Sequence, residues 1–354
     1  MHSVMRRHLL PILALAVAAG AFAAAPPAGN EPAEAVRPWS FILLPDTQHY
    51  TSFHPEVFAR QTEWIVANEQ ALNLKFVLQL GDLTDNNADP EWLNARHAID
   101  TLRRARIPYL LASGNHDIGI WGNSSDRRTR FGDYFHGMDY GAPNLGFRPW
   151  NSVGFFQRGQ MENAYVTKEI HGTKFLLLSL EFGPRHAVVE WANKVVAEHP
   201  GHFVILVTHA YLYSDSTRYD WAAKGRDQKW SPHAYPIGQS PEGVNDGEQL
   251  WQKLVKRHRG FLFTFNGHVG NDGTGYLVSR GDHGQEVHQM LANYQTEVDA
   301  RHPDGGGGFL RILTVAVDGR SVDVRTYSPH LDRWLTEADH QFVMTLDRSL
   351  HDAP

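Results

Sequence analysis

Several absences narrow what this sequence of 354 residues can be. It contains no cysteine, which excludes disulfide bridges and lipid attachment at a cysteine. Its formal net charge is -6, so it has no basic footprint for nucleic acid. Beyond the N-terminus, no apolar run approaches the roughly 20 residues of a membrane-spanning helix, and we find no internal repeat. If the protein is exported, its stability must therefore come from its core and any bound metal.

The first 23 residues have the three parts of a secretory signal peptide. A basic start, MHSVMRRH, precedes a short apolar core and an Ala-x-Ala-like exit. We expect a mature chain that begins near Ala24 and a protein that is periplasmic or secreted. Residues 24–37 are dominated by Gly, Pro, Ala and Glu, which predicts a flexible lead-in.

Residues 38–350 are predicted to form a single domain with two loop insertions, at 121–160 and 211–247. Both insertions are rich in aromatic and polar residues and show little periodicity. Long segments of this kind are more often functional loops or lids than filler. Their Tyr and Trp side chains either bind an organic group of a substrate or pack the loops against the body; both interpretations stay open.

The stretch from residue 76 to 117 predicts a strand, a helix and a second strand. The apolar runs 76–80 and 109–112 each stop at a glycine that is followed by polar residues, as buried parallel strands do at their carboxyl ends. Asp89 is the expected N-cap of the helix, with Pro90 at its first position. One face of this helix is predicted to carry the apolar side chains Trp92, Leu93, Ile99 and Leu102.

The remaining pattern predicts an α/β fold. The expected helices are 55–68, 187–199 and 248–259, and the expected strands of the first part are 41–44, 165–170, 174–182, 202–207 and 261–265. Further strands are expected at 286–294, 309–317, 321–327 and 342–346. Antiparallel strands after an α/β half fit a four-layer α/β/β/α sandwich, in which helices flank two mixed sheets.

Ligand-type side chains follow five of these apolar runs. They are Asp46, Asp82, Asn115, His209 and His268. Because α/β sheets place their chemistry at the carboxyl ends of their strands, we expect these side chains to lie together.

These segments, in this order, resemble the motif series of the calcineurin-like metallophosphoesterase family. The matching stretches are PDTQ at 45–48, GDLTD at 81–85, GNHD at 114–117, VTHAY around His209 and GHVG at 267–270. The resemblance covers the chain from about residue 41 to about residue 270. It implies a phosphate-ester substrate and two divalent metal ions (Mn, Zn or Fe).

By this resemblance Asp82 bridges the two ions. Asn115, His209 and His268 complete the second site, while Asp46 and Gln48 belong to the first site. The alternatives are that Asp82 is only a turn residue after its strand and that His209 is an ordinary core histidine.

Two positions of the first site depart from the family pattern. Gln48 and Gly270 stand where the family has histidines. An amide oxygen is a poorer ligand than imidazole for a borderline ion, and glycine offers no side chain. The first site is therefore expected to bind weakly, or another group completes it, with His49, His283 and His288 as candidates.

The resemblance assigns His116 to the leaving-group oxygen, as general acid or as a cationic stabiliser. Asp117 either fixes the tautomer of His116 or caps the loop, and Asp85 is expected to be a cap or a support for the ligands. Four arginines of the insertions are either phosphate contacts or solvated surface groups: Arg127, Arg128, Arg130 and Arg218.

The sequence thus predicts metal-dependent hydrolysis of a phosphate monoester or diester by a metal-activated hydroxide. The alternative is a non-catalytic exported binding protein that contains metal and holds a glycan, a nucleotide or an envelope component. Gln48 and Gly270 favour the binding protein. The intact GNHD segment, which a binding role does not need, favours the enzyme.

Overall fold

The computed structural model of the chain describes residues 37–140, 149–270, 273–295 and 304–354. The predicted signal peptide and almost all of the lead-in lie outside these residues. Residues 37–354 form one compact unit. Within the described residues, no helix is long and apolar enough to cross a membrane.

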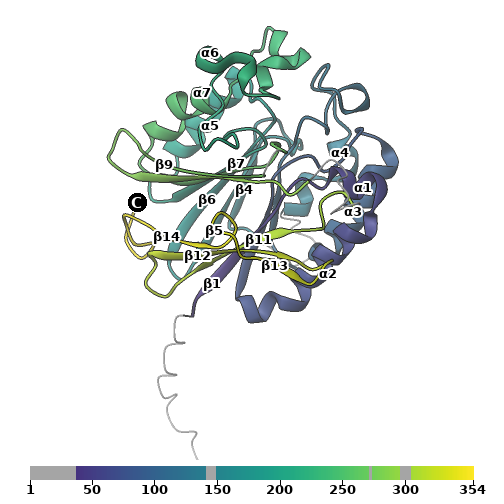
Figure 1. The fold of residues 1–354 in the computed structure, drawn as a ribbon. Coiled ribbons are helices and arrows are strands. Elements are labelled where there is room, and N and C mark those ends of the chain that lie inside the picture. Colours follow the sequence, from purple (N-terminus) through teal and green to yellow (C-terminus); the bar gives the residue numbers. More distant parts are fainter. Residues whose placement is uncertain (1–36, 141–148, 271–272, 296–303) are drawn as a thin grey trace, which may run out of the picture. The chain divides into compact units, whose positions relative to one another are not determined.

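The first sheet is mixed and has seven strands in the order β13-β12-β11-β1-β2-β3, with β14 also paired to β12 (Figure 1). β1, β2 and β3 run parallel, and the remaining pairs are antiparallel. The strands are β1 (Trp39–Leu44), β2 (Leu74–Gln79), β3 (Tyr109–Leu111), β11 (Leu310–Val315), β12 (Ser321–Ser328), β13 (Arg333–Leu335) and β14 (Phe342–Thr345).

The second sheet is also mixed, with seven strands in the order β4-β5-β6-β7-β8-β10-β9. Its central strands β6, β7, β8 and β10 are parallel. The strands are β4 (Ser152–Phe155), β5 (Ala164–Ile170), β6 (Thr173–Leu180), β7 (Phe203–Thr208), β8 (Phe261–Asn266), β9 (Thr274–Arg280) and β10 (Glu286–Ala292).

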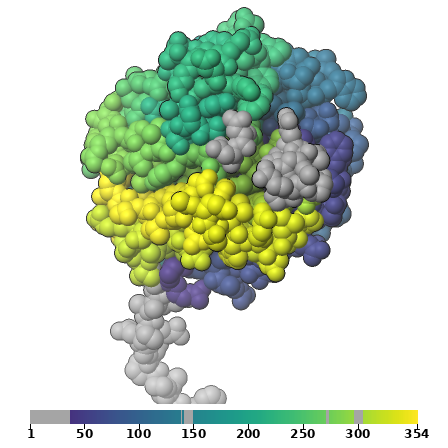
Figure 2. Space-filling model, viewed as in Figure 1, coloured from purple at the N-terminus to yellow at the C-terminus, as the bar shows by residue number. Residues whose placement is uncertain are grey.

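The two sheets pack face to face, and aromatic side chains fill the space between them. On the face seen in Figure 2, the last part of the chain (yellow) lies directly against earlier segments (green). The ring of Phe41 on β1 lies 5.9 Å from that of Phe265 and 6.2 Å from that of Phe263, both on β8. At another point Ser179 Oγ on β6 donates a hydrogen bond of 2.9 Å to the carbonyl of Leu111 on β3.

Helices cover the outer face of each sheet (Figure 1). α1 (Gln48–Phe53), α2 (Pro55–Leu72) and α3 (Asp89–Arg104) accompany the first sheet, and α5 (His186–Ala197) and α7 (Gly247–Lys253) the second. β7 is apolar from Phe203 to Val207 because both of its faces are buried. Val204 and Leu206 share a core with α5, whereas Phe203 and Ile205 belong to the core between the sheets. The predicted four-layer α/β/β/α sandwich is confirmed.

The hairpin and the helix that follows it agree with prediction. β5 and β6 pair antiparallel, from Ala164 opposite Ser179 to Ile170 opposite Thr173. The turn uses His171 and Gly172, both with positive φ (50° and 84°), as tight hairpin turns require. The predicted inward side chains of α5 are all buried: Val188, Ala192, Val195 and Val196.

Two details of α3 differ from the prediction. Ala88, with extended backbone, is the N-cap, so the helix starts at Asp89, one residue earlier than expected. Leu93 is 58% exposed, while Trp92 is fully buried. The reason is angular: Leu93 lies about 100° around the helix from Trp92, beyond the stripe that faces the sheet.

The predicted helix 248–259 is shorter than expected. α7 ends at Lys253 because Leu254 leaves helical geometry (φ -135°, ψ -65°), and a 3₁₀ turn at Val255–Arg257 follows. Leu254 and Val255 are both fully buried, so packing overrides the local helical pattern. The strands β4, β9 and β13 were not predicted, and β4 lies within the first insertion.

Candidate metal centre

The carboxyl ends of parallel strands from both sheets meet and bring the predicted ligands together. In the first sheet Leu44 of β1 is opposite Gln79 of β2, so the loops that carry Asp46 and Asp82 start side by side. In the second sheet Val207 of β7 is opposite Phe265 of β8, which aligns the loops of His209 and His268.

Two glycines leave the space that the side chains of Asp82 and His209 occupy. Its backbone is left-handed (φ 50°), and its Oδ1 accepts a hydrogen bond of 2.8 Å from the backbone N–H of His116. A Cβ at Gly114 would lie 2.0 Å from Asp82 Oδ1, and one at Gly81 would lie 2.4 Å from His209 Nδ1. The glycines that precede Asp82 and Asn115 are therefore required by close packing against the ligand side chains.

His209 presents one ring nitrogen to the centre. Its Nδ1 donates to the carbonyl of Leu80 (2.8 Å), which leaves Nε2 as the ligand atom. Nε2 lies 3.0 Å from Asp82 Oδ2 and 3.2 Å from Asn115 Oδ1. It lies 4.0 Å from Asp46 Oδ2, so this fully buried imidazole faces both carboxylates.

His268 links three parts of the chain. Its backbone N–H, in left-handed conformation (φ 76°), donates to both oxygens of Asp46 at 3.1 and 3.0 Å. Its ring Nε2 donates to the carbonyl of Trp230 in the second insertion (2.7 Å), which leaves Nδ1 for a metal. A Cβ at Gly267 would lie 2.0 Å from Asp46 Oδ1, so a glycine is required here too.

The charges of this cluster call for a cation. Asp82, His209 and His268 place ligand atoms within 4.8 Å of one another. Burial raises the pKa of Asp46 to about 7, with His209 opposing this rise and the charge of Asp82 adding to it. Burial lowers the pKa of His209, but the charges of Asp82 and Asp46 outweigh it and raise that pKa to about 9. Two buried carboxylates a short distance apart are stable as anions only with positive charge between them.

Gln48 has an atom that fits the first site. Its Nε2 donates to Asp85 Oδ1 (3.2 Å), while its Oε1 is buried without a hydrogen-bond partner among the described residues. An orphaned buried carbonyl oxygen is costly unless it meets a cation or a water. The residues present therefore fit a divalent metal, with Asp46, Gln48 and Asp82 as candidate ligands.

One supporting residue of the first site was missed in the sequence. Asn293 Nδ2 donates to Asp46 Oδ2 (2.9 Å), and its Oδ1 accepts from the backbone N–H of Gln295 (3.0 Å), which fixes its orientation. Asn293 follows β10, which runs parallel to β8. Its position at the end of a predicted strand was the available sequence signal. This signal is nearly the same as the one that identified the other five residues.

The three histidines considered for the first site have different locations. His283 is exposed, with its Nε2 against the carbonyl of Arg257 (3.0 Å). His288 Nδ1 pairs with the hydroxyl of Tyr276 (2.6 Å), and His288 lies five residues before Asn293 on β10, about 17 Å along the strand. Neither is placed to complete the first site. His49 adjoins Gln48 in α1 and packs against Gly305. A Cβ built at position 305 would lie 2.7 Å from the Cβ of His49.

His116 is oriented beside the ligands. Its Nδ1 contacts the backbone carbonyl of Asp85 (2.7 Å) and lies 3.6 Å from the Asp85 carboxylate. Burial lowers its pKa, but the charge of Asp82 and the contacts with Asp85 outweigh burial, so the pKa of His116 is raised. The geometry leaves Nε2 for a substrate.

Asp117 joins two loops. Its oxygens accept hydrogen bonds from the backbone N–H groups of Gly114, Leu83 and Thr84 and from the Thr84 hydroxyl. Burial, and next the charge of Asp82, raises the pKa of Asp117 to about 6. Of the two predicted roles, these contacts correspond to the cap, because they fix the GDLTD loop against the GNHD loop.

The four arginines considered as phosphate contacts are held by protein groups. Arg127 donates to the carbonyls of Phe182 (3.0 Å) and Gly183 (2.7 Å). The other three form ion pairs: Arg128 with Asp126 (2.7 Å), Arg130 with Asp89 (2.6 Å) and Arg218 with Glu248 (2.6 Å).

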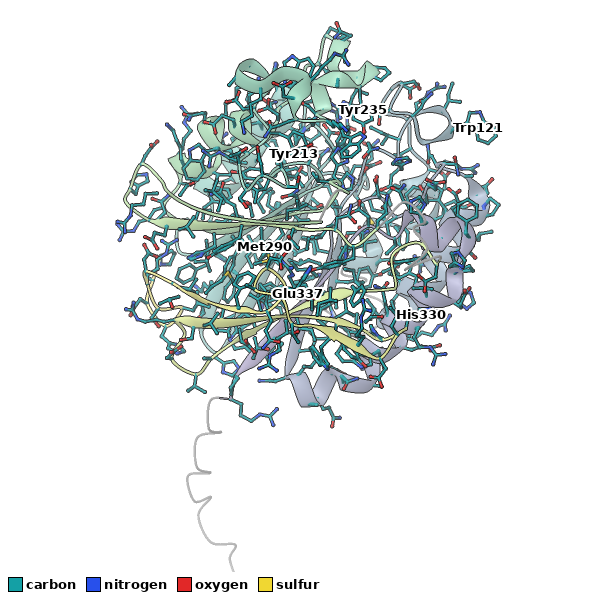
Figure 3. All side chains as sticks on the ribbon, in the orientation of Figure 1. Trp121, Tyr213, Tyr235, Met290, His330 and Glu337 are labelled. Carbon is teal, nitrogen blue, oxygen red and sulfur yellow. The ribbon has the colours of Figure 1, made fainter. Side chains whose placement is uncertain are left out.

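Half of the six aromatic side chains of the second insertion are buried, and the other half are partly or largely exposed. Tyr211, Tyr213 and Tyr219 are buried. Trp230 is 38% exposed, and Trp121 of the first insertion is 74% exposed. Figure 3 shows Trp121 projecting from the molecule and Tyr235 within the insertion region.

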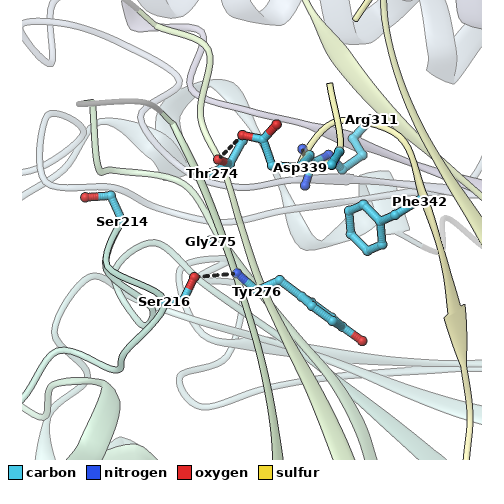
Figure 4. A pocket seen from close by; sticks show the side chains of 9 residues that line it. Ser214, Ser216, Thr274, Gly275, Tyr276, Arg311, Asp339 and Phe342 are labelled. Carbon is cyan, nitrogen blue, oxygen red and sulfur yellow. Dashed lines mark hydrogen bonds between the residues drawn. The ribbon is translucent and has the colours of Figure 1, made fainter. Parts of the chain in front are cut away.

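A cavity of about 480 Å³ lies apart from these ligands, where β9 of the second sheet adjoins β11 and β14 of the first (Figure 4). Its polar lining groups bond to one another. Thr274 Oγ1 donates to Asp339 Oδ2 (2.8 Å), and the backbone N–H of Tyr276 donates to Ser216 Oγ (3.2 Å). Arg311 donates to the carbonyl of Asp339 (3.0 Å). None of the predicted metal ligands lines this cavity.

Comparisons with known proteins found a relative in sequence and solved structures of low similarity. Uncharacterized protein YvnB of Bacillus subtilis is 29% identical over 298 residues, which are 83% of this chain and 20% of that protein; the chain thus spans about a fifth of its relative's length. Two solved structures are similar at low identity. GAP50, the anchor in the inner membrane complex of Plasmodium, has a TM-score of 0.46 and 10% identity, with 89% of this chain and 90% of that one covered. The Thermus thermophilus sulfate thiohydrolase SoxB has a TM-score of 0.37 and 11% identity, with 79% and 43% covered.

The decisive match is to the family model described as calcineurin-like phosphoesterase, which covers residues 40–269. That range contains all six predicted ligands and His116. The chain belongs to the calcineurin-like phosphoesterase family.

Proposed function

We propose that this protein hydrolyses phosphate esters with two bound divalent metal ions. The observation that carries the proposal is the buried convergence on Asp82, whose carboxylate lies 3.0 Å from His209 Nε2 in the cluster with His268. Membership of the phosphoesterase family supports the same class of reaction.

The ligands divide into two sites that share Asp82. The second site has Asp82, Asn115, His209 and His268, a mixture of oxygen and imidazole that suits Mn, Zn or Fe. The first site has Asp46, Gln48 and Asp82, which are all oxygen ligands. Bound divalent cations lower the pKa of water and neutralise phosphoryl charge, which is the chemistry that in-line attack on phosphorus needs.

His116 supplies the group for the leaving oxygen. Its Nδ1 is engaged by the backbone carbonyl of Asp85 (2.7 Å), so the ring presents Nε2. In its protonated form this imidazole can donate a proton to an alkoxide or stabilise its charge. Asp85 positions this ring and also accepts from Gln48, so it connects His116 to the first site.

The test is metal analysis of the purified protein combined with hydrolysis of p-nitrophenyl phosphate and bis-p-nitrophenyl phosphate. Both should be measured after chelation and after addition of Mn, Zn, Fe or Ca. We expect hydrolysis that chelation removes and added metal restores. Metal binding without turnover of either ester in any metal would contradict the proposal.

That negative result would favour a non-catalytic metal-containing binding protein. The observation on its side is position 270, where a glycine offers the first ion no side chain and a Cβ would meet no atom of the described part of the chain within 4 Å. A binding role does not need the oriented ring of His116, which is why hydrolysis is the first proposal.

We also propose that the protein is exported to the periplasm or the medium, as residues 1–23 suggest. N-terminal sequencing of the protein from its native host should find a mature end near Ala24. A retained Met1 on the active protein would contradict export by this route.

A further inference from the structure

Tyr235 of the second insertion reaches the metal-ligand cluster. Its ring lies 6.2 Å from the ring of His268 and 5.1 Å from that of Phe182, which packs edge-on. The Phe182 ring in turn lies 6.0 Å from that of His209. Tyr235 thus extends an aromatic wall that already borders both imidazole ligands.

The backbone around Tyr235 is fixed. Tyr235 joins two 3₁₀ turns, η5 (Pro232–Ala234) and η6 (Pro236–Gln239), each with a proline near its start. The next residue but one, Ile237, donates its N–H to the carbonyl of Ser124 (3.2 Å). Ser124 Oγ donates to the carbonyl of Asn115 (2.8 Å), so this segment is tied through the first insertion to a predicted ligand loop.

The Tyr235 hydroxyl is available to a ligand. The described residues include no hydrogen-bond partner for it, and the side chain is only partly buried, so the hydroxyl is not sealed in the core. The nearby tyrosines differ. Tyr219 donates to the carbonyl of Lys229 (2.9 Å), and the Tyr211 hydroxyl is completely buried.

The phenol of Tyr235 can act as a donor at neutral pH. The ordinary pKa of a tyrosine is about 10, so the hydroxyl keeps its proton and can donate a hydrogen bond.

We propose that Tyr235 is a catalytic residue whose hydroxyl donates a hydrogen bond to a non-bridging oxygen of the phosphoryl group undergoing hydrolysis. This inference rests on the proposed phosphoesterase function. A fixed neutral donor aimed at an oxygen that gains charge in the transition state stabilises that state more than the ground state.

Tyr235→Phe is the direct test, because it removes the hydroxyl and keeps the ring contacts with Phe182 and His268. With metal-loaded protein and p-nitrophenyl esters, we expect kcat to fall on the order of 10²-fold, as when one oxyanion donor is lost. Metal content should change little, and KM should rise by no more than the roughly 10-fold loss expected for phosphate binding. The matched control is Tyr211→Phe in the same insertion, which removes a completely buried hydroxyl and should leave kcat unchanged.

Binding of inorganic phosphate, measured by calorimetry, provides an arm that does not depend on turnover. Tyr235→Phe should weaken phosphate binding about 10-fold relative to the wild type. If the wild type hydrolyses no ester, the proposed function fails. The calorimetric titration with phosphate still decides whether Tyr235 contacts a phosphoryl group.

Three results would overturn the inference. They are equal kcat and equal phosphate affinity in Tyr235→Phe and wild type, loss of metal from Tyr235→Phe, and absence of phosphate binding to the metal-loaded wild type. Loss of metal would mean that Tyr235 supports a ligand rather than the substrate.

Discussion

The two sites of the proposed metal centre differ in the chemistry of their candidate ligands. The second site would take two imidazoles, whose other ring nitrogens are held by the carbonyls of Leu80 and Trp230. The first site has no imidazole among its candidate ligands. It depends on Asp46, which is held by the N–H of His268 and by Asn293, and on the amide oxygen of Gln48.

This difference predicts unequal affinity. Imidazole ligands with fixed tautomers favour borderline ions such as Zn, whereas an oxygen-rich set favours harder ions such as Mn. The second site should therefore retain its ion through purification. The first site should lose its ion more readily and respond best to added Mn.

The largest expected effect comes from the ligand that both sites share. Asp82→Asn should release metal and reduce hydrolysis to background, because a neutral amide cannot bridge two cations as a carboxylate does. Metal analysis and rate measurement on the same sample check this. Asp126→Asn removes a partly exposed carboxylate that pairs with Arg128 and serves as the control. Near-native metal content and rate in Asp82→Asn would show that Asp82 does not bridge.

His116→Ala tests whether chemistry and metal binding can be separated. We expect both ions to stay bound while the rate falls by roughly 10²–10⁴-fold, the loss typical of a general acid. The loss should shrink for esters whose leaving group is already acidic. Rates for a series of leaving groups check this, and equal losses for good and poor leaving groups would indicate that His116 only positions the substrate.

Asn293→Ala acts on the first site alone. It removes the donor to Asp46 Oδ2, and loss of such a support typically weakens metal binding by about 10- to 100-fold. Calorimetric titration with Mn should show weaker binding at the first site and unchanged binding at the second. Equally weaker metal binding at both sites would contradict this role. A fall in the thermal unfolding midpoint large enough to explain the weaker binding would contradict it as well.

Gly270→His should have the smallest effect and the opposite sign. Position 270 lies outside the left-handed region, and a Cβ there meets no atom of the described residues within 4 Å, which favours a side chain at this position. The added imidazole should tighten the first site and lower the Mn concentration needed for half-maximal activity. Gly270→Ala adds a side chain without a ligand atom and should behave as the wild type; an equal response of both variants would exclude ligation by the new imidazole.

Much of the centre was predictable because its residues obey a local rule. Asp46, Asp82, Asn115, His209 and His268 each follow an apolar strand closely, and parallel strands bring their carboxyl ends to one edge. Asn293 obeys the same rule but was missed, because its role depends on the parallel pairing of β10 with β8, which the sequence does not display.

The misplaced elements have tertiary causes. Leu93 matches an apolar pattern but points to solvent, and the helix predicted to reach residue 259 ends at Lys253 because Leu254 and Val255 turn into the core. The contact of Trp230 with His268 crosses 38 residues of chain, and no local pattern encodes such a contact. Periodicity identifies which elements exist, but packing decides where they end.

The most direct test of the account is calorimetric titration of metal-stripped protein with Mn, with ester hydrolysis measured at each point. We expect two binding steps of unequal affinity, with activity rising only as the weaker step saturates. Two ions bound with equal high affinity would contradict the assignment of a weak first site. A single ion bound with no hydrolysis at saturating Mn would contradict the phosphoesterase itself.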